Sequence, residues 1–323
     1  MKIFITGASG FVGGAAAAFL ARKGHEVVAM SRSADSDARI SLLGAWPVRC
    51  SLADTTPAHL QGIDVVVHAA AFVGEWGNYQ TYFETNVTGT EKMVAAAKQA
   101  GVKKFIHIST ESVLFAGQDL INVDESYPYP ATPFYYSKTK QLAEKAVIAA
   151  NEPGIFDTIC LRPRMIWGPG DKTILPLMKD AVLRRQFIWI NGGAFKTSTT
   201  HIDNLTHAIA LAIDKGKSGA LYFITDDETL VLREFCTRLL ATQGVKPVNK
   251  SMPKWLVRTV AWLIENTWQL LRIKSRPPVT RLGAAIFSSH CTLNIDNAKK
   301  ELCYLPAISI AAGLAAMGQL NGR

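Results

Sequence analysis

The stretch that decides the fold is Thr6-Gly7-Ala8-Ser9-Gly10-Phe11-Val12-Gly13. It continues an apolar run, residues 2–6, that is typical of a strand, and it opens an alanine-rich run, residues 12–23, that is typical of a helix. Gly7 permits a tight turn, Gly10 has no side chain to obstruct a phosphate, and Gly13 lets the helix pack close to the strand. The helix N-terminus then offers unpaired N–H groups to an anion. This turn predicts a dinucleotide pyrophosphate site.

Outward from the turn, apolar runs rich in valine or isoleucine recur at residues 26–30, 64–68 and 104–108. Helical patterns separate these runs, as over residues 85–100. Continuous apolar strands that alternate with helices are typical of a parallel sheet covered by helices on both faces. We therefore predict an α/β fold, a Rossmann-like doubly wound parallel sheet with a smaller C-terminal substrate lobe.

The regular alternation fades after Arg162-Pro163, where Gly168-Pro169-Gly170 and Gly192-Gly193 interrupt the chain. Glycine and proline breaks of this kind mark loops. We place a dinucleotide-binding Rossmann domain at residues 1–165. Residues 166–323 are expected to form mainly the substrate-binding lobe, with some segments returning to the Rossmann domain.

Ser31-Arg32 ends the second predicted strand, where NAD-selective proteins carry an acidic residue. A carboxylate there binds the ribose hydroxyls and repels a 2′-phosphate, whereas an arginine pairs with that phosphate. The sequence therefore predicts NADP(H) as the preferred cofactor, with NAD(H) as the alternative.

Tyr136 and Lys140 are four residues apart in a run of good helix formers. This spacing puts both on one helix face, so we expect the ammonium to lower the pKa of the phenol, which is about 10 when unperturbed. Tyr135 lacks such a partner because the residue four positions later is Thr139. Tyr136 is therefore the candidate acid–base group.

Hydroxyl side chains follow the predicted strand at residues 104–108, in Ser109-Thr110-Glu111-Ser112-Val113. They fall at the carboxyl edge of the sheet, where open α/β folds bind ligands, and a hydroxyl there can hold a reacting oxygen. His68 and His107, in contrast, are interpreted as satisfied core histidines that the chemistry does not need.

The net charge of +9 comes from basic residues spread along the chain, which argues against a nucleic-acid partner. The five cysteines include no C-x-x-C pair, so we expect no disulfide framework and no metal site. The chain enters its first strand without a signal segment. These features together predict a cytoplasmic protein.

Residues 254–272 have an amphipathic helical pattern. Apolar residues such as Trp255 and Leu263 recur at helical spacing, while Lys254 and Arg258 belong to the opposite stripe. Such a helix either covers the substrate pocket, forms a subunit contact, or lies in a membrane interface as a peripheral contact.

Taken together, these motifs resemble the extended short-chain dehydrogenase/reductase superfamily, or NAD-dependent epimerase/dehydratase superfamily, over nearly the whole chain. Besides the glycine turn, the likeness rests on His68-Ala69-Ala70-Ala71, Asn86-Val87-Thr88-Gly89-Thr90 and Tyr136-x-x-x-Lys140. It implies that Tyr136 is the general acid or base, that Lys140 also holds the nicotinamide ribose, and that Thr110 binds the substrate oxygen.

The resemblance also implies a set of cofactor contacts. They are Gly7, Ser9, Gly10, Phe11, Val12, Gly13, Ser31, Arg32, Ser51, Leu52, Ala69, Ala70, Ala71, Asn86, Ser109, Tyr136, Lys140, Pro163, Arg164 and Met165. One of them departs from the pattern: Ser51 stands where the family often has an aspartate that binds the adenine amine, which weakens that contact.

Within the superfamily, residues 161–171 and 222–228 resemble the 3β-hydroxysteroid dehydrogenase group. Residues 70–77 look most similar to its bacterial hydrocarbon-biosynthesis branch, which reduces 2-alkyl-3-oxoalkanoates with NADPH. The resemblance implies interconversion of a ketone and a secondary alcohol on a bulky apolar substrate, of the 3-oxo acid or 3β-hydroxysteroid type. It also implies a homodimer. The alternative is a nucleotide-sugar epimerase or dehydratase with tightly bound NAD.

Tryptophans outside the expected sheet core bear on the substrate. They either line an apolar pocket or fill the core of the lobe: Trp76, Trp167, Trp255, Trp262 and Trp268.

Overall fold

A computed structural model of the chain describes residues 1–273 and 275–321 and confirms the predicted α/β fold. Its main sheet has seven strands, all paired in parallel, in the order β12-β7-β5-β4-β1-β2-β3. The strands are β1 (Lys2–Thr6), β2 (Glu26–Ser31), β3 (Trp46–Arg49), β4 (Val65–His68), β5 (Lys104–Ile108), β7 (Asp157–Pro163) and β12 (Leu221–Ile224). The strand order reverses between β1 and β4, so ligands are expected at the carboxyl ends of these two strands.

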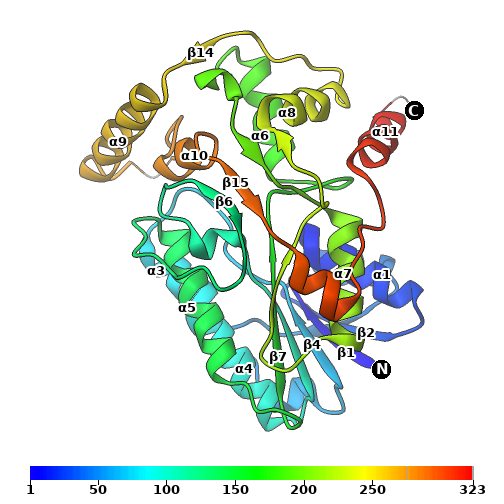
Figure 1. The fold of residues 1–323 in the computed structure, drawn as a ribbon. Helices are drawn as coiled ribbons and strands as arrows, with labels where there is room; N and C mark the ends of the chain where they lie inside the picture. Colours follow the sequence, from blue (N-terminus) through cyan, green and yellow to red (C-terminus); the bar gives the residue numbers. More distant parts are fainter. Residues whose placement is uncertain (274, 322–323) are drawn as a thin grey trace.

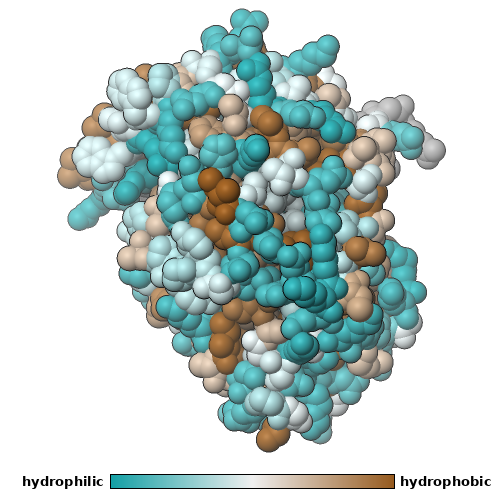
Figure 2. Space-filling model, viewed as in Figure 1, coloured by the Kyte–Doolittle hydropathy of each residue, from teal (hydrophilic) through white to brown (hydrophobic). Residues whose placement is uncertain are grey.

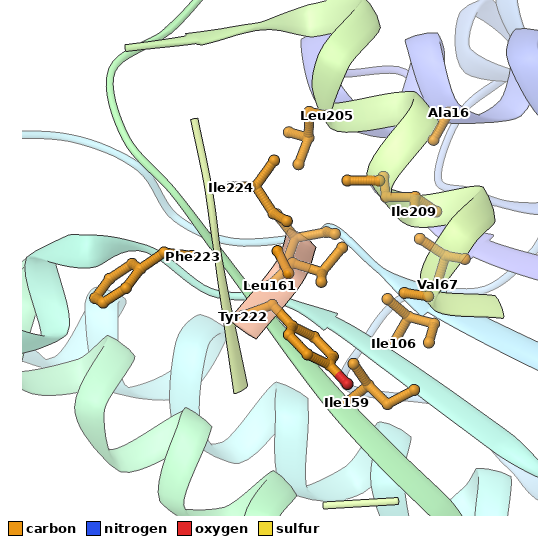
Figure 3. Close-up of a cluster of buried hydrophobic side chains, with 14 of the residues drawn as sticks. Ala16, Val67, Ile106, Ile159, Leu161, Leu205, Ile209, Tyr222, Phe223 and Ile224 are labelled. Atoms are coloured by element: carbon orange, nitrogen blue, oxygen red, sulfur yellow. The ribbon is translucent and has the colours of Figure 1, made fainter. Parts of the chain in front are cut away.

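Helices cover both faces of this sheet because successive strand residues point to opposite sides (Figure 1). Ile3 and Ile5 pack on the face covered by α1 (Phe11–Arg22), α2 (Ala34–Leu42) and α7 (Ile202–Lys215). Figure 3 shows this layer, with Ile209 of α7 above Val67 and Ile106 of the sheet.

Phe4 points to the opposite face, which α4 (Gly89–Gln99) and α5 (Tyr135–Ala149) cover. The helix predicted over residues 85–100 is present, but its first turn is π-helical. The short helix α3 (Tyr79–Tyr82) runs into a π-helical turn at Phe83–Thr88, and regular α-helix begins only at Gly89. A bulged turn of this kind re-aims side chains and often lies at a functional site.

The remaining strands form smaller sheets above the carboxyl edge of the main sheet (Figure 1). A four-stranded sheet joins β13 (Leu230–Val231), β10 (Lys196–Thr197), β15 (Cys291–Leu293) and β6 (Leu120–Val123). Two-stranded sheets join β8 (Ile166–Trp167) to β11 (Thr200–His201) and β9 (Trp189–Ile190) to β14 (Ser251–Met252).

The two sheets exchange segments across residue 165. β6 lies before this position but belongs to the four-stranded sheet. After it, β12 adds the edge strand of the main sheet and α7 packs on one face of that sheet. The helices of the smaller part are α6 (Ile174–Leu183), α8 (Leu232–Ala241), α9 (Lys254–Leu270), α10 (Arg281–Ile286) and α11 (Ile310–Asn321).

Trp167 fills the core of this smaller part, where it is fully buried. Its indole Nε1 donates to Asp226 at 2.8 Å, and its ring meets the ring of Phe235 edge to face. Trp255 and Trp262 are exposed instead. The tryptophans therefore do not form one cluster. Among the described residues, no helix combines the length and apolar character needed to span a bilayer.

Candidate active site

The glycine turn has the geometry that the sequence predicts. Gly7 has a φ of +74°, in the left-handed region, and α1 begins at Phe11 after Gly10, with no side chain capping its N-terminus. A Cβ on Gly7 would lie 2.9 Å from the amide nitrogen of Ala70, and one on Gly13 would collide with the carbonyl of Gly7. Only glycine fits these positions, and the uncapped helix end faces the space that Gly10 leaves open.

The loops after β1 and β4 meet at this turn. Ala70 donates its amide to the Thr6 hydroxyl at 3.0 Å, which holds residues 69–71 against the glycine turn. Asn86 closes the same loop from the π-helical turn, since its side chain accepts from the Phe72 amide at 2.7 Å and donates to Thr139 at 3.1 Å. The backbone cradle therefore suits a dinucleotide pyrophosphate.

Ser31, the last residue of β2, and Arg32, which follows it, differ in their exposure to solvent. Ser31 is buried and its hydroxyl bonds the Ser33 carbonyl at 3.2 Å, while Arg32 is exposed and has no ion pair among the described residues. The nearby carboxylate of Asp37 is engaged by Arg49, and the pKa of Asp37 is lowered by hydrogen bonding to Ser31 and by Arg49. Arg32 is thus free to meet an anionic group.

Ser51 and Leu52 lie in the next loop. The Ser51 hydroxyl donates to Asp54 at 2.6 Å. The side chain of Leu52 packs against Gly89 at the start of α4.

Tyr136 lies in the first turn of α5, and its surroundings differ from the prediction. The pKa of its phenol is raised rather than lowered, first by burial and second by the negative charge of Glu111. A hydrogen bond with Thr110 acts in the opposite direction but is weaker. The prediction that Lys140 lowers the pKa of Tyr136 was wrong, because the ammonium contacts the Ile108 carbonyl and His107 instead.

Lys140 is buried, and its Nζ donates to the Ile108 carbonyl at 2.8 Å and contacts Nε2 of His107 at 3.3 Å. Burial lowers the pKa of Lys140 to about 8. Burial likewise lowers the pKa of His107 well below its usual value, so the imidazole is neutral and can accept this hydrogen bond.

The two histidines therefore differ. Both ring nitrogens of His68 are engaged, by Thr6 at 2.9 Å and Thr90 at 3.0 Å, as a satisfied core histidine requires. His107 stacks on His68 at 5.5 Å but positions Lys140, and its Nδ1 has no partner among the described residues. The interpretation of His107 as a satisfied core residue was wrong.

Thr110 adjoins a buried ion pair that the sequence analysis missed. Its hydroxyl donates to Glu111 at 2.8 Å, and the other carboxylate oxygen of Glu111 binds Arg164 at 2.5 Å. Arg164 also donates through Nε to Thr197 at 3.1 Å. The chain Tyr136–Thr110–Glu111–Arg164 thus crosses from α5 to the end of β7. A signal existed: Glu111 and Arg164 follow the neighbouring parallel strands β5 and β7.

Further predicted cofactor contacts follow the same strands, β5 and β7. Ser109 is buried and its hydroxyl has no partner among the described residues, so it is available to a ligand. Pro163 ends β7, and Met165 has a φ of +42°. The amide of Arg164 already donates to Thr200, at 3.0 Å. A buried hydroxyl without a protein partner, at the same carboxyl edge of the sheet as the glycine turn, fits a bound dinucleotide.

The parallel sheet, the glycine cradle and the Thr110, Tyr136 and Lys140 side chains define the class: an NAD(P)-dependent dehydrogenase or reductase of the extended short-chain type. The chain belongs to the 3-beta hydroxysteroid dehydrogenase/isomerase family, whose sequence profile matches residues 4–254. The family predicted from the motifs is confirmed.

Relatives cover almost the whole chain. The 4-hydroxy-2-methyl-3-oxo-4-farnesyl-3,4-dihydroquinoline-1-oxide ketoreductase of Stigmatella aurantiaca is 38% identical over 322 residues, which cover 99% of this chain and 96% of the relative. The 2-alkyl-3-oxoalkanoate reductase of Stenotrophomonas maltophilia (strain K279a) is 33% identical and covers 97% of each chain.

Among solved structures, UDP-glucuronic acid 4-epimerase from Bacillus cereus in complex with NAD superimposes with a TM-score of 0.75. The alignment covers 99% of this chain and 100% of the epimerase at 22% identity, which shows a common fold and no more.

Proposed function

We propose that this protein is an NADPH-dependent ketoreductase that converts a 3-oxo group on a bulky apolar substrate into a secondary alcohol. The observation that carries the proposal is the position of Tyr136, in the first turn of α5 beside the Thr110 hydroxyl, with Lys140 buried one turn further along the helix. The phenol is protonated at neutral pH, since burial raises its pKa above the ordinary value of about 10. Reduction of a ketone needs a proton donor at the carbonyl oxygen, and a protonated phenol is one.

In the proposed mechanism, the dinucleotide supplies a hydride when it is bound. Tyr136 donates a hydrogen bond to the carbonyl oxygen and gives its proton to that oxygen as negative charge develops. For Thr110 to hold the same oxygen, its hydroxyl proton turns from Glu111 to the carbonyl when the substrate binds. In this structure Glu111, itself held by Arg164, accepts the hydrogen bond of the Thr110 hydroxyl and so positions this side chain. Lys140, with a pKa of about 8, can exchange a proton through Nζ near neutral pH.

The substrate class rests on the relatives. Two of them are named for the reduction of a ketone, one on a farnesylated quinoline and one on 2-alkyl-3-oxoalkanoates. Both substrates combine an oxo group with a long apolar substituent. The alternative of a nucleotide-sugar epimerase or dehydratase is supported only by likeness of fold.

The test is NADPH oxidation against a panel of 2-alkyl-3-oxo acids, 3-oxosteroids and nucleotide sugars. Tyr136→Phe should lower kcat for the preferred oxo substrate by about 10²–10⁴-fold, the usual contribution of an acid–base group. Tyr135→Phe is the matched control, because this adjacent tyrosine is exposed and outside the chain of contacts. Full activity in Tyr136→Phe, or turnover of nucleotide sugars without net NADPH oxidation, would overturn the proposal.

The cofactor preference is proposed from Arg32, which directly follows β2, is exposed, and has no ion pair among the residues that the structure describes. Arg32→Ala should lower kcat/KM for NADPH by about 10–100-fold, the loss of charge-assisted hydrogen bonds, and leave kcat/KM for NADH nearly unchanged. Arg39→Ala, on the exposed side of α2, is the control. An unchanged ratio of the two kcat/KM values in Arg32→Ala would remove this arginine from cofactor selection.

A further inference from the structure

Helix α9 packs on the protein through its charged side. Arg258 donates to Ser288 at 2.9 Å and to the Gly117 carbonyl at 2.9 Å. Glu265 is buried and accepts from the Arg281 amide at 2.6 Å. Ala261, between them on the same face, is fully buried. Arg258 and Glu265 of the predicted polar stripe therefore face inward, whereas Gln269 and Arg272 are exposed.

Five apolar side chains of α9 and of its C-terminal end are exposed, whereas Leu256, Val260, Ile264 and Trp268 are half-buried. Relative exposures are 68% for Trp255, 51% for Trp262, 52% for Leu263, 81% for Leu270 and 62% for Leu271. Positions 255, 262, 263 and 270 share one face of a helix at 3.6 residues per turn. Figure 2 shows brown and pale side chains along the upper left edge of the molecule, where α9 lies in Figure 1.

Positive charge surrounds this apolar stripe. Residues 246–276 contain seven lysines and arginines and a single acidic residue, Glu265, so six of the nine net positive charges of the chain lie in this segment. Lys246 and Lys250 are exposed before the helix, and Arg272 is exposed after it. Arg276 is also exposed but pairs with Glu75 at 2.6 Å. Although basic residues are spread along the chain, acidic residues are nearly absent here, and this absence concentrates the excess charge.

We propose that the outer face of α9 is a membrane-docking surface that lies flat in the interface of an anionic phospholipid bilayer. Tryptophan and leucine side chains enter the boundary between headgroups and acyl chains, and the lysines and arginines at both helix ends bind the anionic headgroups. An apolar stripe with tryptophans, flanked by a segment in which Glu265 is the single acidic residue, is complementary to such a surface in both polarity and charge. Asp119 and Glu75, from other segments, lie beside Lys254 and Arg276.

The experiment is flotation of the purified full-length protein with unilamellar vesicles of phosphatidylcholine, with and without phosphatidylglycerol. Binding should require phosphatidylglycerol and weaken as salt is raised. The double variant Trp262→Ser, Leu263→Ser should lower the vesicle partition coefficient by at least about tenfold. Lys250→Ser and Arg272→Ser should each lower it by about fivefold on anionic vesicles.

Trp46→Ser is the matched control, because this tryptophan is 70% exposed on β3, at the far edge of the main sheet. It should bind vesicles as the unmodified chain does. Circular dichroism and NADPH binding of the double variant establish that it is folded.

Three outcomes overturn the proposal. One is an absence of vesicle binding by the unmodified protein, and another is binding that the double variant leaves unchanged. The third is a dimer, measured by light scattering, that the double variant converts to monomer without any vesicle binding, since a second copy would then cover this face.

Discussion

Helices α5 and α9 both direct charged side chains toward the protein, but the surroundings of these charges differ. On α5, Lys140 and Glu144 are buried against the main sheet, where Lys140 belongs to the active site and Glu144 pairs with Arg162 of β7. On α9, Arg258 and Glu265 bond a small layer of loops and the start of α10. Because α5 is packed on several sides, its charges determine stability and chemistry, whereas those of α9 mainly orient a surface.

The largest expected effect tests the charges of α5. Glu144 and Arg162 are fully buried and joined by hydrogen bonds of 2.7 and 3.0 Å. Glu144→Gln leaves the Arg162 guanidinium without a counter-charge, so it should lower the free energy of unfolding by about 3–5 kcal/mol. Urea denaturation measures this. Glu152→Gln, which alters an exposed pair with Lys98, is the control and should change stability by less than about 1 kcal/mol.

The second effect is a pH dependence that comes from Lys140. Its pKa is about 8 in the folded protein and 10.5 when unperturbed, so between these values the unfolded chain binds more protons. Stability contributed by this group should therefore rise with pH, by about 3 kcal/mol between pH 8 and 10.5. The measurement is the unfolding free energy of the cofactor-free protein minus that of Lys140→Met across this range.

Lys254 of α9 sharpens this comparison. Partial burial, and then the charge of Arg258, lower its pKa as well. Because its side chain remains about a third exposed, Lys254→Met should show a rise in the same direction but a much smaller one. Equal pH dependence in the two helices would contradict the distinction between them.

The smallest effect tests the charges of α9. Glu265 accepts the Arg281 amide at 2.6 Å, and its ion pair with the Arg281 side chain spans 4.0 Å beside solvent. Glu265→Gln keeps an acceptor for the amide, so the free energy of unfolding should fall by less than about 1 kcal/mol. If Glu265→Gln lowered the free energy of unfolding as much as Glu144→Gln does, the greater burial of the α5 charges would not explain their effect on stability.

The fold was predictable because its signals are local. The glycine turn, the apolar strands and the Tyr136–Lys140 spacing each lie within a few residues, and the strand order then brings their ends to one edge. The active-site chain was only partly predictable. Thr110 and Tyr136 follow from motifs, but the Glu111–Arg164 pair joins residues 53 positions apart and depends on the neighbouring placement of β5 and β7.

The sequence by itself determined a doubly wound sheet, a glycine turn at a helix N-terminus, and the choice of Tyr136 over Tyr135 as the candidate acid–base residue, since these depend on periodicity and on residues close in the chain. Only the tertiary structure decided the direction of the Tyr136 pKa shift, because burial and the charge of Glu111 come from distant segments. It alone also decided which side of α9 faces out. An amphipathic pattern defines two faces of a helix, but the inward face is selected by the hydrogen-bond partners that the rest of the fold presents.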